Sequence, residues 1–181
     1  MKKFINKKHR VLLAVVFIFA VLTISVNFWK TGNNQNSYSI NQENLLRVFV
    51  ERVVDGDTII VNVPENNLGL TQRERVRLIG VDTPETVHPT RGAEPYGIEA
   101  SDFAKEVLER QHVFLDFDRE LRDRYGRVLA YVYTEDGDHF NARLVKEGYG
   151  IAYLNYEFKY MDEFSRYENE AKQKRLGLWG L

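Results

Sequence analysis

Residues 46–63 read LRVFVERVVDGDTIIVNV. Apolar, mostly β-branched residues flank Asp55-Gly56-Asp57 on both sides, and this pattern is typical of two antiparallel strands joined by a tight turn. A third run of the same kind, Arg75–Val81, follows a polar loop. The sequence therefore predicts a three-stranded meander, with strands at 46–54, 58–63 and 75–81.

Downstream of the meander, helix-like and strand-like patterns alternate. Residues 82–97 contain three prolines and two glycines, which are too many for a helix. Between residues 100 and 108, apolar side chains recur at the spacing of one helical face, so we expect an amphipathic helix there. Alternating patterns at 113–117 and 128–133 predict two more strands.

Two further helices are expected near the carboxyl terminus. One begins at an N-cap, Asp138, and ends at Gly148, and the other carries an apolar stripe from Tyr160 and ends near Gly177. Together these elements predict an α+β fold that is mainly β. The expected architecture is a five-stranded, partly open OB-fold barrel with three helices.

The first 44 residues have a different composition from the rest. Five of residues 1–10 are Lys or Arg, and residues 11–29 are uncharged and mostly apolar. As a helix this run would span about 28 Å, which matches the hydrocarbon core of a bilayer. Because no good small-residue cleavage site follows, the pattern favours an uncleaved transmembrane signal anchor over a cleaved secretory peptide.

Charge asymmetry around this run predicts its orientation. The basic residues 1–10 are expected to stay in the cytoplasm, so that the domain at 45–181 is displayed outside a single-pass membrane protein. Residues 30–44, rich in Asn, Gln and Ser, are expected to form a flexible linker. Later release of a secreted form is the alternative to permanent display.

Composition excludes several kinds of chemistry. The chain has no cysteine, which rules out disulfides, iron–sulfur clusters, thiolate zinc sites and a cysteine nucleophile. After residue 30, the chain contains 19 Lys and Arg residues but 26 Asp and Glu residues. Such a domain has no general positive field for a polyanion, so an anionic substrate must be held by local arginines or by a bound cation.

Acidic residues at strand ends are the first candidates for a site. P-loop, Rossmann, serine-hydrolase and zincin motifs are all missing from the sequence. Asp55-Gly56-Asp57 could be only a turn, as the repeat Asp136-Gly137-Asp138 suggests. However, Asp82 ends the third predicted strand of the same meander, so these carboxylates could converge on one hard cation such as Ca²⁺ or Mg²⁺.

Two arginines and a glutamate complete the candidate set. Arg77 alternates with two apolar neighbours in its strand, and Arg127 enters the last strand. Both could be solvated surface residues, but together with a cation they could clamp phosphate oxygens. Glu85, in a proline-containing loop, would then be placed to activate water, although an exposed loop glutamate is the simpler interpretation.

Three motifs in the right order carry a resemblance to the thermonuclease, or staphylococcal nuclease, family. They are VVDGDT at 53–58, RLIGVDTPET at 77–86 and DRYGR at 123–127, supported by YGIEAS at 96–101. The resemblance covers residues 46–179. It implies a calcium-dependent OB-fold phosphodiesterase that cuts DNA and RNA with little sequence preference, leaves 3′-phosphate ends, and prefers single-stranded or unstacked regions.

The resemblance also implies roles for individual residues. Asp57, Asp82 and the backbone carbonyl of Thr83 are expected to bind Ca²⁺, with Asp55 close by. The implied catalytic residues are Arg77, Glu85 and Arg127, with Glu85 the usual candidate for the general base. Substrate contacts are expected at Arg124, Tyr125 and Tyr153, and a shorter segment after Gly148 leaves Tyr156 as the alternative to Tyr153 for stacking on a base.

Other classes of function remain open at this stage. An OB barrel can bind single-stranded nucleic acid or a protein without cutting anything, and an anchored barrel can be purely structural. The alternatives make different predictions. A binding module retains nucleic acid without cutting it, whereas a structural protein neither binds nor cuts nucleic acid. We expect the nuclease domain to act as a monomer.

Overall fold

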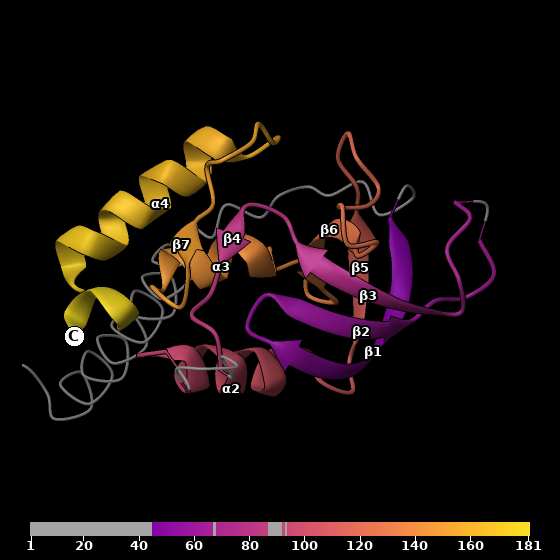
Figure 1. Cartoon of the computed structure of the whole chain (residues 1–181), viewed down its shortest axis with the longest axis horizontal. Coiled ribbons are helices and arrows are strands. Elements are labelled where there is room, and N and C mark those ends of the chain that lie inside the picture. Colours follow the sequence, from indigo (N-terminus) through magenta and orange to yellow (C-terminus); the bar gives the residue numbers. More distant parts are fainter. Residues whose placement is uncertain (1–44, 67, 87–91, 93) are drawn as a thin grey trace, which may run out of the picture. The chain divides into compact units, whose positions relative to one another are not determined.

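A computed structural model describes residues 45–66, 68–86, 92 and 94–181 (Figure 1). The predicted basic segment at 1–10, the signal anchor at 11–29 and the linker at 30–44 all lie outside the described residues. Within the described part of the chain, none of the helices combines the length and the apolar character that a membrane crossing requires.

Five strands form a closed barrel in the order β1-β2-β3-β6-β5. Their bounds are β1 Leu46–Asp55, β2 Thr58–Asn62, β3 Arg73–Leu78, β5 His112–Asp116 and β6 Val128–Thr134. Neighbouring strands are antiparallel except β3 and β6, which pair in parallel and close the barrel. The five predicted barrel strands are confirmed, and the barrel is closed rather than partly open.

Inward-pointing residues of these strands fill the barrel. They follow the period of two that the sequence showed, and burying such side chains contributes about 1.5–3 kcal/mol each. The core of the barrel includes Val48, Val50, Ile59, Val61, Val76, Leu78, Val113, Leu115, Val128, Ala130 and Val132.

A break after Leu78 corrects the predicted strand 75–81. Gly80 has φ +77°, and a Cβ atom there would lie 2.6 Å from the Phe158 ring. The chain therefore turns at Gly80 and starts a separate short strand, β4 (Val81–Asp82), which pairs with β7 (Ile151–Ala152) outside the barrel. Asp82 consequently lies on this second sheet and not at the end of the third barrel strand.

Three α-helices pack around the two sheets (Figure 1). They are α2 (Gly97–Leu108), α3 (Phe140–Lys146) and α4 (Met161–Lys174), followed by the 3₁₀ helix η2 (Gly177–Gly180). The α2 helix packs on β1, whereas α3 packs on α4, β6 and β4. All three predicted helices are present.

Two helix boundaries differ from the prediction. The N-cap of α3 is His139 and not Asp138, whose carboxylate instead pairs with Arg143 at 3.2 Å. The α4 helix ends at Lys174, since Arg175 takes a left-handed conformation at φ 52° before Gly177 is reached.

Asn141 joins α3 to the barrel. Its fully buried side chain accepts a hydrogen bond from the Val132 N–H at 2.8 Å and donates to the carbonyls of Ile79 and Ala130 at 3.0 and 3.1 Å. This one amide satisfies backbone groups of β6 and of the turn after β3. It therefore stabilises the point where the chain leaves the barrel for β4.

We predict that Asn141→Ala lowers the free energy of unfolding by about 2–4 kcal/mol, because three buried hydrogen bonds to backbone groups are lost, although the Ala130 carbonyl keeps another donor, the Ile79 N–H. Asn62→Ala, at an exposed position of β2, should change it by less than about 0.5 kcal/mol. Chemical denaturation of both variants provides the measurement. Equal, small losses in the two variants would show that the Asn141 bonds do not stabilise the fold.

Candidate active site

Arg77 lies at the centre of a cluster of charged residues. Its Nη1 donates hydrogen bonds to the carbonyl oxygens of Leu78 at 3.1 Å and Val81 at 2.7 Å. Its Nη2 donates to Asp82 Oδ1 at 2.6 Å, and Nη1 lies 3.1 Å from Asp57 Oδ2. Only 13% of the Arg77 side chain is exposed, so this arginine is not a solvated surface residue.

The pairing of β2 with β3 explains why Arg77 meets Asp57. Thr58 is the register partner of Arg77, and the Leu78 N–H donates to the Asp57 carbonyl at 2.9 Å. The Asp57 carboxylate is buried and accepts hydrogen bonds from the Thr58 hydroxyl and from the backbone N–H and hydroxyl of Thr83. The turn that begins β2 thus also holds the loop after β4.

Three glycines allow other segments to approach the loop at 82–85. A Cβ atom would lie 2.8 Å from Thr83 Oγ1 at Gly56, 2.6 Å from the Glu85 carbonyl oxygen at Gly97, and 2.8 Å from the Asp82 carbonyl oxygen at Gly150. Such distances are below van der Waals contact, so a larger residue would displace the loop. The β1–β2 turn, the start of α2 and the segment before β7 therefore fix this loop jointly.

Glu85 faces other carboxylates. Hydrogen bonding to Asp55, partial burial, and the charges of Asp55, Asp57 and Asp82 raise the pKa of Glu85 to about 7. Partial burial also raises the pKa of Asp82. The charges of Asp57 and Glu94 raise it further, whereas the guanidinium of Arg77 lowers it. Four carboxylates share one end of the barrel, and their mutual repulsion favours proton or cation binding.

Arg127 directly precedes β6, the strand that pairs with β3. Arg77 is the parallel register partner of Leu129, and Arg127 precedes Leu129 by two residues, so the two arginines share one face of the sheet. Asp123 holds Arg127 through an ion pair of 2.7 Å between Nε and Oδ2. The charge of Arg127 lowers the pKa of Asp82, as the weakest of the five effects on that carboxyl group.

Arg124 and Tyr125 form the outer part of this loop. Arg124 Nη2 donates to the Tyr125 hydroxyl at 2.6 Å, and its guanidinium carbon lies 4.7 Å from the centre of the Tyr125 ring. The Arg127 guanidinium lies 5.5 Å from the same ring, which is 69% exposed. Tyr125 therefore connects an exposed aromatic surface to Arg127, whereas no contact joins Arg124 directly to the carboxylates among the described residues.

Tyr153 and Tyr156 follow β7 in the chain. Their ring centres lie 5.1 Å apart in an edge-to-face contact. In both tyrosines the charge of Arg77 lowers the pKa of the hydroxyl and the charge of Asp82 raises it. The Tyr153 N–H donates to the Gly80 carbonyl at 2.9 Å, which fixes its backbone. Both tyrosines lie beside the site, so the structure does not separate the two alternatives for base stacking.

The donor set fits a hard divalent cation. Asp57 and Asp82 both contact the guanidinium of Arg77, and Thr83, the residue after Asp82, adds a backbone carbonyl. Carboxylate and carbonyl oxygens are the ligands that Ca²⁺ prefers. No group of three or more acidic or histidine side chains is spaced to hold a metal by itself in the part of the chain that the structure describes. Water or substrate oxygens would have to complete the coordination sphere.

Sequence reasoning missed the residues that hold this site in place. Asp123 was not assigned a role, although its position four residues before Arg127 in a turn was the available signal. Glu94 accepts a hydrogen bond from the Glu85 N–H at 3.1 Å across a connection that no periodicity predicts. Gly97 and Gly150 were likewise missed, because their contacts depend on segments far apart in the sequence.

Comparison with known proteins agrees with this geometry. Residues 75–180 match the family described as "Staphylococcal nuclease homologue". Over 166 residues the chain is 36% identical to a thermonuclease of Staphylococcus hyicus, covering 91% of this chain and 94% of that protein. Over 132 residues it is 47% identical to a thermonuclease of Staphylococcus intermedius, covering 72% and 74%. It is also 42% identical over 146 residues to Endonuclease YncB of Bacillus subtilis, covering 78% and 65%.

These matches extend over most of the domain and include all the residues of the charged cluster from Arg77 onward. They confirm the family predicted from the three motifs. The chain therefore belongs to the staphylococcal nuclease family, and it is a hydrolase of the nuclease class.

Proposed function

We propose that the domain hydrolyses phosphodiester bonds of DNA and RNA in a calcium-dependent reaction with little sequence preference, leaving 3′-phosphate ends. The observation that carries this proposal is the contact of Arg77 with both Asp57 and Asp82, next to Glu85 and Arg127. A non-catalytic OB-fold module has no need to collect these groups at one place, where their mutual repulsion is unfavourable.

Asp57, Asp82 and the carbonyl of Thr83 are the residues proposed to hold Ca²⁺. When bound, the cation supplies positive charge to polarise a phosphate oxygen and to orient the reacting groups. Both aspartates contact the same guanidinium, that of Arg77, which brings them to one place in the site. Asp55 would remain near them, hydrogen-bonded through Oδ1 to the Gly56 N–H at 3.0 Å.

The arginines and Glu85 have complementary roles in the proposed reaction. Glu85 accepts a proton from a water molecule whose oxygen attacks phosphorus, the bond from phosphorus to the 5′ oxygen breaks, and the leaving oxygen takes a proton from solvent to become the 5′-hydroxyl. Arg77 and Arg127 donate hydrogen bonds to the phosphate oxygens as negative charge grows on them. Because the Arg77 and Arg127 side chains are held by backbone carbonyls and Asp123, they are oriented before substrate arrives.

Substrate recognition would depend on phosphate contacts and aromatic stacking. The Tyr125 ring lies beside Arg127, and the rings of Tyr153 and Tyr156 meet after β7, so these rings are the candidates for stacking on bases. Stacking tolerates any base, and it favours single-stranded or unstacked regions whose bases are accessible. We expect one domain, as a monomer, to form the whole site.

We also propose that this nuclease domain is displayed outside the cell membrane. The proposal is supported by the apolar run at 11–29 and the basic residues before it. A negatively charged domain that meets its substrate outside the cell has access to the Ca²⁺ that the site requires. The membrane would be the partner of the amino-terminal segment only.

The full-length protein, purified in detergent, should cut single-stranded DNA in the presence of Ca²⁺ and should stop cutting when EGTA is added in excess. Terminal transferase should extend the products only after phosphatase treatment, because a 3′-phosphate blocks extension. Retention of DNA without cleavage in Ca²⁺ would instead favour the binding-module alternative. Cleavage that continues unchanged in EGTA would refute calcium dependence.

Glu85→Gln should reduce the single-turnover rate at saturating Ca²⁺ by about 10²-fold or more, because a general base contributes a factor of that size. The matched control is Glu106→Gln, an exposed glutamate on α2, for which we expect an unchanged rate. The measurement is rapid-quench cleavage of an end-labelled oligonucleotide. An unchanged rate for Glu85→Gln would remove this residue from the general-base role.

Protease added to intact cells should digest the domain while a cytoplasmic marker stays protected, since the predicted orientation exposes residues 45–181. Immunoblotting against the carboxyl terminus provides the measurement. A domain that survives until the cells are lysed would contradict display outside the membrane.

A further inference from the structure

Glu74 and Arg122 form an ion pair that the proposed reaction does not use. Glu74 belongs to β3 and is 8% exposed. Arg122 Nη2 donates to Glu74 Oε1 at 2.7 Å and Nη1 donates to Oε2 at 3.0 Å, so the pair is bidentate. The N–H and hydroxyl of Thr71 also donate to Glu74 Oε1, at 2.7 and 2.9 Å, which fixes the carboxylate on both sides.

Arg122 also belongs to the loop that carries Arg127. Its Nη1 donates to the Gly126 carbonyl at 2.9 Å, while Asp123 Oδ1 accepts from the N–H groups of Tyr125 and Arg127 at 2.9 Å each. The Asp123 N–H donates back to the Arg127 carbonyl at 3.0 Å. The loop is therefore a closed ring of hydrogen bonds, and Arg122 is the residue that connects this ring to Glu74.

From this arrangement we propose that Glu74 is a positioning residue, which sets the loop at 122–127 against β3 and thereby places Arg127 beside Arg77. The proposal rests on the catalytic role of Arg127 in the proposed function. β3 then carries one arginine of the phosphate clamp directly, at Arg77, and orients the other through the Glu74–Arg122 pair. Glu74 itself need not touch the substrate.

Burial and charge make this link persistent. Hydrogen bonding to Arg122 and Thr71 lowers the pKa of Glu74 to about 2, so the carboxylate stays ionised at any pH where the domain would act. Its charged form is favoured because the guanidinium supplies two parallel N–H donors. The Glu74 side of the pair is buried while the Arg122 side chain is 34% exposed, so salt screens the pair less than it would a fully exposed one.

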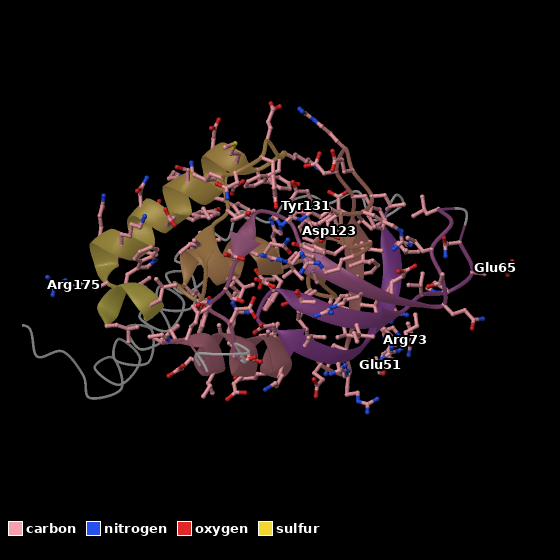
Figure 2. All side chains as sticks on the ribbon, in the orientation of Figure 1. Glu51, Glu65, Arg73, Asp123, Tyr131 and Arg175 are labelled. Carbon is pink, nitrogen blue, oxygen red and sulfur yellow. The ribbon has the colours of Figure 1, made fainter. Side chains whose placement is uncertain are left out.

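The same strand offers a matched control. Arg73 precedes Glu74 and makes a bidentate pair with Glu51 of β1, at 2.7 and 3.0 Å, which Figure 2 shows at the edge of the barrel. This second pair has similar geometry, but both of its side chains are substantially exposed and neither contacts the loop at 122–127. Loss of the Arg73–Glu51 pair therefore shows the effect of removing an ion pair from β3 that does not involve the loop at 122–127. Comparison with it isolates the effect of the Glu74–Arg122 pair.

The test is a double-mutant cycle on the full-length protein with an oligonucleotide substrate and Ca²⁺. Glu74→Gln should lower kcat by about 10-fold or more, because a small displacement of a clamping group is costly. In the Arg127→Lys background the same change should lower kcat by less than about twofold, since the group that it positions is already altered. Glu51→Gln should leave kcat unchanged in both backgrounds.

Amide hydrogen exchange provides a readout that does not depend on activity. Glu74→Gln should accelerate exchange at Tyr125 and Arg127, whose N–H groups bond to Asp123, but not at barrel amides such as Val61. Arg122→Lys, which keeps the charge and loses the bidentate geometry, should give an intermediate effect and serves if Glu74→Gln does not fold.

Each outcome decides a separate point. Equal factors for Glu74→Gln in both backgrounds, or loop exchange as slow as in the unmodified protein, would overturn the positioning role. If Arg127→Lys alone left kcat unchanged, the catalytic role of Arg127 would fail, and the exchange rates would still decide whether Glu74 fixes the loop. Unfolding measured by denaturation on each variant separates these results from a loss of folded protein.

Discussion

One guanidinium connects the segments that make up the functional end of this barrel. Arg77 emerges from β3 and contacts the turn before β2 through Asp57, β4 through Asp82, and the backbone between them through the carbonyls of Leu78 and Val81. Without this positive charge the buried Asp57 carboxylate would face Asp82 with no counter-ion. This contact joins the two aspartates, while Glu94 and Asp123 hold Glu85 and Arg127.

Charge at the site contrasts with charge on the domain. The domain has more acidic than basic residues, so nucleic acid gains little from a long-range field. Two arginines held by Asp123 and by backbone carbonyls offer N–H donors for phosphate oxygens instead, and the carboxylates beside them, which outnumber the arginines, favour binding of a divalent cation. In this arrangement attraction of the polyanion is confined to the place where its phosphates would react.

Local patterns predicted the elements better than their connections. Alternation of apolar residues indicated the five barrel strands because each inward side chain is set by the two-residue period of a strand. The same pattern ran through Ile79 and Gly80 without a break, so the sequence suggested one strand to Val81. The turn uses the positive φ of Gly80, and the Phe158 ring, from a distant segment of the chain, leaves no room for a side chain there, a contact that no local pattern contains.

The amino-acid sequence by itself determined the family, the barrel strands and the three helices, since short motifs and periodicity are local properties. Its motifs also singled out Asp57, Arg77, Asp82, Glu85 and Arg127, whose roles are those of the proposed function. Tertiary structure alone decided that β3 and β6 pair in parallel, that Asp82 lies on a second sheet, and that Glu74 reaches Arg122. These contacts join residues distant along the chain. Their existence depends on packing that brings the strands together, and packing is a property of the whole fold.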